Sequence, residues 1–321
     1  MGENHENLVL DYKTELAFSR DKIKNAHIDN QRLYSEWKMK TKIFLLILSL
    51  FTITMFAQDN ELKFNHMYFV VDSASFSKLK YDKKLNTLVN IDQGIPAFNP
   101  IDSASTTLYL RGKSTYVEIM GPDNRFKEKV GAIGLGFSWD THDTINNKIS
   151  KKLRKPSREE FISFDAKWNF GSNEVNWYTA FYTEMKGFIS TWYAYYNPQF
   201  LSNLYQQDFS IFTRELFLEK AYAKNKPIND LSEITLNCTG DDFKKITTEL
   251  SLFFFKSKKI KASSAVFDIG TVKLKLNKSM ENKNSIKQLI FSTKEDINDA
   301  SKDFGSIELR YKTDKIEFNF K

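Results

Sequence analysis

One histidine and one carboxylate stand out because each lies on a strand-like segment beside tyrosines. His66 is in the segment KFNHMYFVVD, and Glu118 is in the segment STYVEIMGP. Side chains alternate between the two faces of a strand, so we expect His66 to share a face with Tyr68, and Glu118 with Tyr116. Imidazole nitrogen and carboxylate oxygen both bind divalent metals. The two segments therefore predict a polar site in one cavity, in which Zn, Fe, Mn or Ni would be the metal.

The segments that position this pair belong to a unit that recurs along the chain as strand, helix and further strands. Two such units are expected between Leu62 and Tyr205, and two weaker ones after Asp230. Runs of β-branched and aromatic residues bounded by Gly, Pro, Asn or Asp are typical of strands. The expected strands cover residues 64–71, 106–111, 115–120, 132–140, 161–170, 177–185, 189–196, 233–238, 265–268, 272–276, 285–292, 306–311 and 315–320.

Helices are expected after the first strand of each unit. The first helix is predicted to begin at Ser73 or Ser75, because serine is a common N-cap. In residues 141–153, isoleucine and leucine recur every fourth residue, which indicates one apolar helix face. Further helices are expected over residues 198–218 and 241–253, with a brief one near Asp296.

The amino-terminal residues differ in composition from the rest of the chain. Two lysines precede an uncharged apolar run over residues 43–56, and Ala57 follows it. This order is typical of a secretory signal peptide, and the run is shorter than the roughly 20 residues that span a bilayer. We expect residues 39–57 to be a cleaved signal peptide and the protein to be periplasmic or extracellular. Residues 1–38 are then an upstream mis-start; the alternative is a cytoplasmic tail with an uncleaved signal anchor.

Composition argues against several classes of function. The net charge of +7 is spread thinly, and no segment combines basic and aromatic residues as a nucleic-acid groove does. Cys238 is the only cysteine, so no intramolecular disulfide is expected. The chain has no Gly-x-Ser-x-Gly elbow and no Gly-rich phosphate loop with lysine. Nucleic acid is therefore not an expected partner, and a nucleotide cofactor is not expected.

Aromatic residues are concentrated between Phe161 and Tyr205. There they make up 15 of 45 residues, about twice the 15% of the whole chain. Core packing explains many of these rings, but alternation directs some of them to each face of a sheet. Arg111 is also placed to recognise an anionic group. An aromatic-lined pocket for an aromatic or apolar ligand is thus predicted, with contacts from Tyr68, Arg111, Tyr116, Trp177, Trp192 and Tyr195.

The repeated unit resembles the vicinal oxygen chelate superfamily, which includes glyoxalase I, bleomycin-resistance proteins and extradiol dioxygenases. The resemblance rests on FNHMYFVVD, YLRGKSTYVEIMGP and GAIGLGFSWD, within residues 62–205. In detail, the chain is similar to a bacterial family of exported glyoxalase-like proteins. The resemblance implies an α+β fold in which paired βαβββ modules form a curved mixed sheet around a cavity. It implies a glyoxalase-like domain over 58–205, a helix and linker over 206–229, and a degenerate glyoxalase-like domain over 230–321.

The same resemblance places His66 and Glu118 where the superfamily holds a divalent metal, on the first and last strands of a module. Aligning the modules through the aspartate after each first strand puts Gly134 at the position of His66. Aligning YVEIMGP with WYAYYNP puts Ala194, or Tyr195 if the register slips, at the position of Glu118. None of these residues is a good metal ligand, so the second module is predicted to have lost its half of the site.

Three interpretations of the pair remain open: a structural hydrogen bond, a metal site completed by water or by a residue such as Glu184 or His142, and a metal-free ligand cavity. The favoured function is an exported, non-catalytic protein that binds a small ligand. One alternative is a metal-dependent lyase, isomerase or dioxygenase that uses His66 and Glu118. The other is a cell-envelope interaction protein, which an apolar patch on residues 228–321 would favour. Pairing of modules between two chains, as a homodimer, is also left open.

Overall fold

The structure is a computed structural model that describes residues 38–42, 61–95, 97–140, 153–154, 162–171, 173–183, 189–253 and 259–321. The chain divides into two compact units, residues 1–58 and 59–321. In the first unit residues 38–42 are helical, and the apolar run expected to be the signal-peptide core lies outside the described residues. In the part of the chain that is described, no helix has the length and apolar character needed to cross a membrane.

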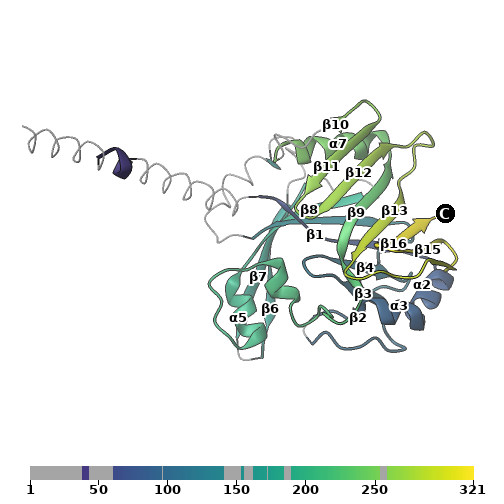
Figure 1. The fold of residues 1–321 in the computed structure, drawn as a ribbon, viewed down its shortest axis with the longest axis horizontal. Coiled ribbons are helices and arrows are strands. Elements are labelled where there is room, and N and C mark those ends of the chain that lie inside the picture. Colours follow the sequence, from purple (N-terminus) through teal and green to yellow (C-terminus); the bar gives the residue numbers. More distant parts are fainter. Residues whose placement is uncertain are drawn as a thin grey trace, which may run out of the picture. The chain divides into compact units, whose positions relative to one another are not determined.

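The first of two sheets in the second unit contains the His66 and Glu118 segments (Figure 1). Its strands are β1 (Lys63–Val70), β2 (Asn90–Asp92), β3 (Thr107–Arg111), β4 (Tyr116–Met120), β5 (Ile133–Trp139), β6 (Ile162–Asn169), β7 (Glu174–Tyr182) and β8 (Ile189–Tyr196). They lie in the order β2-β3-β4-β1-β5-β8-β7-β6. β1 pairs in parallel with β4, β5 pairs in parallel with β8, and an antiparallel β1–β5 pair joins the two halves. Each half is one module.

The second sheet repeats this plan. Its strands are β9 (Ile228–Cys238), β10 (Lys259–Ile260), β11 (Ser264–Ile269), β12 (Val272–Lys278), β13 (Ser285–Thr293), β14 (Ala300–Asp303), β15 (Ile307–Lys312) and β16 (Lys315–Phe320). Their order is β10-β11-β12-β9-β13-β16-β15-β14. The predicted α+β class with paired modules is therefore confirmed, and the described residues show the helix after the first strand in the β1–β4 and β9–β12 modules.

The last module departs from the plan. β13 pairs with β16 antiparallel, whereas the first and last strands of the other three modules are parallel. A parallel pair needs a crossover connection of a dozen or more residues, usually through a helix. Only six residues separate β13 from β14, and they are not helical, so the brief helix expected near Asp296 was wrong. Without that crossover the last strand returns in the opposite direction.

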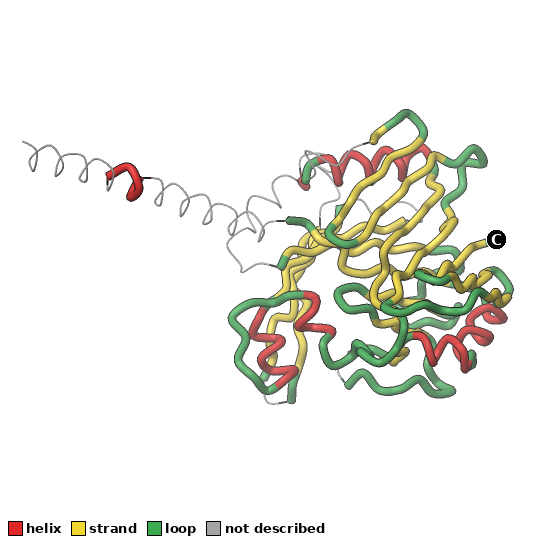
Figure 2. The backbone as a smooth tube through the Cα atoms, viewed as in Figure 1, coloured by secondary structure: helices red, strands yellow, loops and turns green. Residues whose placement is uncertain are grey.

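The described helices are short and lie outside the sheets (Figure 2). They are α2 (Ser73–Lys80), α3 (Lys83–Leu88), α5 (Pro198–Tyr205), α6 (Arg214–Leu218) and α7 (Gly240–Ser251). Asp72, and not Ser73 or Ser75, caps α2, because its side chain accepts a hydrogen bond from the Ser75 amide. The single helix expected over 198–218 is two helices, because Gln206 adopts a left-handed conformation with φ 54° and ends α5. The helix expected over 141–153 lies almost entirely outside the described residues.

One apolar core joins the two sheets. It contains alternate residues of β1, β4, β5 and β8 together with the inward residues of the second sheet. The Phe69 ring of β1 packs edge-on against the Phe320 ring of β16, with centroids 5.2 Å apart. Phe253, just after α7, packs in the same way against Trp139 of β5. Because this face of the first sheet is buried against the second sheet, the other face is the one that is available for a cavity.

Two buried carboxylates connect the sheets through hydrogen bonds. Asp230 of β9 accepts hydrogen bonds from the backbone amides and hydroxyls of Ser114 and Thr115, in the β3–β4 turn. A side chain at Gly112 would place its Cβ 2.3 Å from the Asp230 carboxylate, so this turn requires glycine. Glu249 of α7 accepts hydrogen bonds from hydroxyls of the first sheet, those of Thr183, Thr191 and Tyr193.

The outward face of the second sheet is charged. Ion pairs join Lys275 to Glu233, Arg310 to Glu308, and Lys315 to Glu317. Large exposed apolar side chains in the described part of residues 228–321 are limited to Ile260 and Met280. The apolar patch that would favour a protein-interaction surface is therefore absent from the described residues of this sheet.

Candidate functional site

A cavity of about 510 Å³ lies on the free face of the first sheet. Its walls come from both modules and from the loop after β4. Most of the wall is aromatic, and His66 and Glu118 lie within it. Of the residues predicted to contact a ligand, it contains Tyr68, Arg111, Tyr116, Trp177 and Trp192.

His66 is held between aromatic rings. Its imidazole stacks on the Tyr116 ring of β4, with centroids 4.3 Å apart and planes at 9°. The Trp192 ring of β8 packs against the imidazole at a steeper angle, with centroids 5.0 Å apart. The parallel register of β1 and β4 explains the stack, because His66 and Tyr116 are direct neighbours across the strands. The imidazole therefore has little freedom to rotate.

A hydrogen-bond chain fixes the tautomer of His66. Asn65 donates from Nδ2 to the Tyr196 hydroxyl at 2.8 Å, so its Oδ1 faces His66 Nδ1 at 2.7 Å. Since a carbonyl oxygen only accepts, Nδ1 carries the proton and Nε2 presents a lone pair. A register shift between Phe64 and His66 in the β1–β5 pair accompanies the buried position of Asn65. Burial, together with the positive charges of Arg214 and Arg111, lowers the pKa of His66 well below its usual range. His66 is therefore a neutral hydrogen-bond acceptor at neutral pH.

Glu118 lies opposite that lone pair. Its Oε1 is 3.5 Å from His66 Nε2, which is beyond the distance of a strong hydrogen bond. Burial raises the pKa of the Glu118 carboxyl to about 7, although Arg111 and Arg125 act in the opposite direction. Near neutral pH the carboxyl is thus divided between a neutral donor and a charged acceptor. The cavity wall thus presents the His66 imidazole, an acceptor, next to the Glu118 carboxyl, which is a donor when it is protonated.

The pair supplies only half of a metal site. Its separation and the free Nε2 would allow two ligand bonds of about 2.0–2.2 Å to one ion. However, catalytic metal sites have three protein ligands as a rule, and no group of three His, Cys, Asp or Glu residues occurs among the described side chains. Glu184 and His142, named above as possible third ligands, lie outside the described residues. Arg111 and Arg214 also place positive charge near His66, and the two described donors form an incomplete ligand set for a divalent cation.

Rings occupy the space where the second module would place its ligands. A Cβ at Gly134 would lie 2.0 Å from the Tyr68 ring, and a Cβ at Gly136 would lie 2.6 Å from the Trp192 ring. The two glycines of β5 thus let these rings lie flat over the strand. Ala194 faces the same side and contacts the aromatic cluster behind the cavity. The second module therefore has an aromatic wall at the position where the resemblance would place a counterpart of His66.

One predicted contact was wrong. Tyr195 lies on the opposite face of β8, where its ring stacks on Trp139 in the core between the sheets, with centroids 5.0 Å apart. The alternation of β8 places Trp192 and Tyr196 in the cavity instead. Trp192 and Tyr195 are three residues apart, and strand residues an odd number apart lie on opposite faces of the sheet. Alternation therefore already predicts that the two rings cannot both line the cavity.

Arg111 is built into the wall rather than free within it. Its Nε and Nη2 donate to the two carboxylate oxygens of Asp92, each at 2.8 Å. The guanidinium lies between the rings of Tyr109 and Tyr116, with Cζ 4.7 Å from each centroid. Arg125, in the loop after β4, reaches the cavity from the exposed side and donates to the Tyr109 hydroxyl at 3.2 Å. The positive charge of Arg111 is therefore compensated by Asp92.

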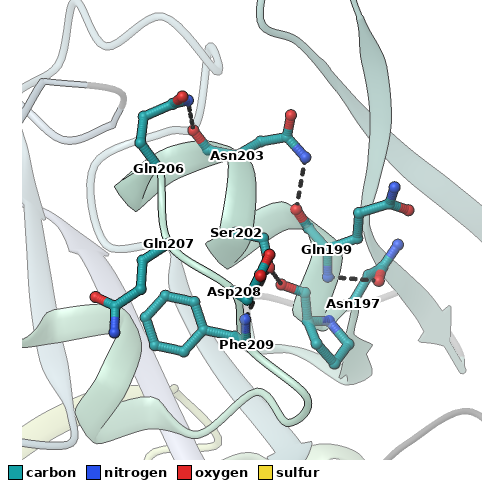
Figure 3. Close-up of a pocket in the computed structure, with 9 residues that line it drawn as sticks. Asn197, Gln199, Ser202, Asn203, Gln206, Gln207, Asp208 and Phe209 are labelled. Carbon is teal, nitrogen blue, oxygen red and sulfur yellow. Dashed lines mark hydrogen bonds between the residues drawn. The ribbon is translucent and has the colours of Figure 1, made fainter.

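A second, more open hollow lies beside α5 (Figure 3). Its lining is rich in amides, but local structure uses several of them. Asn197 accepts from the Gln199 amide as the cap of α5, Asn203 donates to the Gln199 carbonyl, and Gln206 donates to the Asn203 carbonyl. These side chains stabilise the helix and its end, so we do not consider this hollow the main site.

Comparison with known proteins supports the fold and identifies the family. Residues 64–320 match the model of a family of unknown function, DUF5829. A hypothetical protein from Staphylococcus aureus has a similar structure, with a TM-score of 0.50 and 10% identity over 78% of this chain and 98% of its own. No curated protein matches the sequence.

Two further structures are more distant, and their TM-scores are too low to support an argument. A fusion of a xylose isomerase-like TIM barrel with 4-hydroxyphenylpyruvate dioxygenase has a TM-score of 0.41 and 13% identity over 73% of this chain and 36% of its own. A mutant 4-hydroxymandelate synthase from Streptomyces coelicolor has a TM-score of 0.35 and 9% identity over 72% and 70%. The family match covers most of the chain, and we conclude that this protein belongs to the DUF5829 family and is built from paired modules of the βαβββ type.

Proposed function

We propose that this protein binds a small, flat organic ligand in the cavity of the first sheet, and that it does so without a metal and without catalysis. The observation that carries the proposal is the ring-lined cavity of about 510 Å³. This volume is in the range of small-molecule sites, which are mostly apolar with a few placed polar groups. Aromatic walls favour flat ligands because rings stack face to face or edge to face.

The polar groups of the wall would orient such a ligand. His66 Nε2 is an acceptor that receives no hydrogen bond from the described residues, and Glu118 is a donor when protonated and an acceptor when ionised. A ligand hydroxyl can donate to the imidazole while it accepts from the carboxyl. Holding the imidazole by stacking and by Asn65 reduces the entropy lost on binding, since these groups are already ordered.

Isothermal titration calorimetry of the full chain with 2-naphthamide, a flat uncharged probe, tests the proposal. We expect a dissociation constant below about 1 mM, equivalent to about −4 kcal/mol. Ser190→Phe would fill the cavity, because Ser190 lies in its wall. Ser163→Phe is the matched control, since Ser163 is exposed on β6 and is not part of that wall. Binding that is absent from the wild type, or that survives Ser190→Phe unchanged, would contradict a ligand site in this cavity.

Divalent-metal chemistry at His66 and Glu118 is the second candidate, and the free Nε2 lone pair facing a carboxylate is the observation in its favour. Metal analysis of the purified full chain after separate incubation with Zn, Fe, Mn or Ni decides between the two. One equivalent of tightly held metal that is lost in both His66→Gln and Glu118→Gln would support the metal-dependent candidate. No such metal is expected if the cavity binds its ligand through rings and neutral polar groups.

A further inference from the structure

Arg214 is a buried cation whose guanidinium is neither hydrogen-bonded nor ion-paired within the described structure. It lies at the start of α6 and is only 1% exposed. Its three guanidinium nitrogens have no hydrogen-bond partner, and no carboxylate among the described side chains forms an ion pair with it. Instead, Cζ lies 5.3 Å from the Tyr116 ring centroid, 5.4 Å from that of Tyr196 and 5.0 Å from that of Phe217.

Such a position is unfavourable for the folded protein unless something else compensates for it. Aromatic rings attract a cation, but they do not replace the hydrogen bonds that guanidinium makes with water or with a carboxylate. Buried arginines are normally paired, so an unpaired one requires an explanation. The position of Arg214 suggests one, because Tyr116 and Tyr196 are themselves part of the cavity wall. Arg214 therefore lies one ring behind the cavity.

A second buried donor near the cavity is also unpaired. The indole Nε1–H of Trp177 has no acceptor in the described part of the chain, although Trp177 is part of the cavity wall. The Phe217 ring contacts both groups, since it lies 6.2 Å from the Trp177 ring and 5.0 Å from the Arg214 guanidinium. Neither group has an acceptor among the described residues, and an anion in the cavity would offset the charge of Arg214.

The other charges near the cavity do not supply that anion. Asp92 is already paired with Arg111, and His66 is neutral. Glu118 is largely protonated below pH 7. Asp140 interacts with the charge of Arg214 over a distance, but it is hydrogen-bonded to Lys63. At slightly acid pH the guanidinium of Arg214 thus has no directly paired carboxylate among the described residues.

We infer that the cavity selects a flat aromatic anion, such as an aromatic carboxylate, and that the buried charge of Arg214 sets this preference. This inference rests on the proposed function and specifies its ligand class. Arg214 acts through the Tyr116 and Tyr196 rings rather than by contact, which makes it a positioning residue. Low polarity between Arg214 and the cavity lets its field reach the ligand with little screening.

Three probes of one shape but different charge test the inference on the wild-type full chain. They are 2-naphthoate, 2-naphthamide and 2-naphthylmethylammonium, measured by calorimetry at pH 6 in 0.15 M salt. We expect naphthoate to bind at least tenfold more tightly than naphthamide, and the ammonium compound to bind most weakly. If naphthamide binds and naphthoate binds no more tightly, the inference is overturned while the proposed function stands. If none of the three binds, both fail.

Two variants then test the assignment to Arg214. Arg214→Met keeps an unbranched, flexible side chain but removes the charged guanidinium, so the naphthoate-to-naphthamide affinity ratio should fall toward one. The same variant should raise the unfolding temperature, because it relieves an unpaired buried charge. Arg214→Lys should keep most of the ratio, and it also serves if the methionine variant does not fold. A ratio that stays above tenfold in Arg214→Met, or that is lost in a folded Arg214→Lys, would show that Arg214 braces the rings and does not set the charge preference.

Discussion

Glu118→Gln is expected to make the protein more stable at alkaline pH. The pKa of the Glu118 carboxyl is about 7 in the folded chain, compared with an ordinary value of 4.5. Because the folded pKa is raised, the stability associated with the neutral carboxyl is present in full below pH 4.5 and is lost as the pH rises through 7. Each pKa unit corresponds to about 1.4 kcal/mol, so the ionised carboxyl costs the folded state about 3 kcal/mol at pH 8.5. Glutamine resembles the protonated acid and avoids this cost.

The charged and titratable neighbours of Glu118 determine which other groups could change charge between pH 4.5 and pH 8.5. They are His66, Asp92, Tyr109, Arg111, Tyr116, Arg125, Tyr178 and Tyr196. The pKa values of these tyrosines are raised by burial, so they do not ionise below pH 9. The pKa of His66 is lowered, so it also stays neutral between pH 7 and pH 8.5. Glu118 is therefore the group of this cluster expected to change charge near pH 7.

Urea unfolding of the full chain, followed by tryptophan fluorescence at pH 4.5 and pH 8.5, measures the effect. The variant should exceed the wild type in free energy of unfolding by up to about 3 kcal/mol at pH 8.5, and by much less at pH 4.5. Glu281→Gln is the control, because it removes the same charge from an exposed position and should change stability by less than about 0.5 kcal/mol. A difference between variant and wild type that does not change with pH would refute the assignment of a raised pKa to Glu118.

Three further predictions concern other parts of the molecule. Gly134→Ala places a Cβ against the Tyr68 ring, so it should cost about 1–3 kcal/mol in urea unfolding and weaken 2-naphthamide binding; a neutral effect would show that the ring can move aside. Asp230→Ala leaves the donors of the β3–β4 turn unpaired and should cost about 3 kcal/mol, whereas the control Asp268→Ala, at an exposed position, should cost little. Mass spectrometry of protein exported by a bacterial host should find a mature chain that begins near Gln58; an intact residue 39–57 segment on the exported chain would favour the signal-anchor alternative.

Strand alternation carried much of the sequence-based prediction. It predicted that His66 and Glu118 could point into one cavity, and the structure puts His66 Nε2 and Glu118 Oε1 3.5 Å apart across β1 and β4. It could not find Asn65, because the register shift beside it breaks the alternation, and nothing in the local sequence marks a bulge. Repetition of the unit also predicted the sheets well. This prediction failed in the last module. There a six-residue loop stands in place of the expected helix, and β16 pairs with β13 antiparallel instead of parallel.

Long-range contacts account for what the sequence could not show. Arg214 is far from His66 in sequence, and α6 lies within a segment expected to be one continuous helix. An arginine at the start of a helix carries no local sign that it will be buried. Likewise, the pairing of Arg111 with Asp92 depends on the β2–β3 register, so the sequence suggested a free arginine where the structure has a compensated one.

The two glycines of β5 restrict how this protein could regain a second pair of polar ligands. A histidine at position 134 has no room while Tyr68 lies over the strand, and a shorter residue at position 68 would first have to open that space. Each change alone damages the cavity. A histidine at position 134 clashes with the Tyr68 ring, and a shorter residue at position 68 leaves a gap in the aromatic wall. The order of substitutions therefore matters, and introducing a histidine at position 134 through single steps would pass through a less stable protein. The two modules are related by their fold, but their cavity residues are no longer interchangeable.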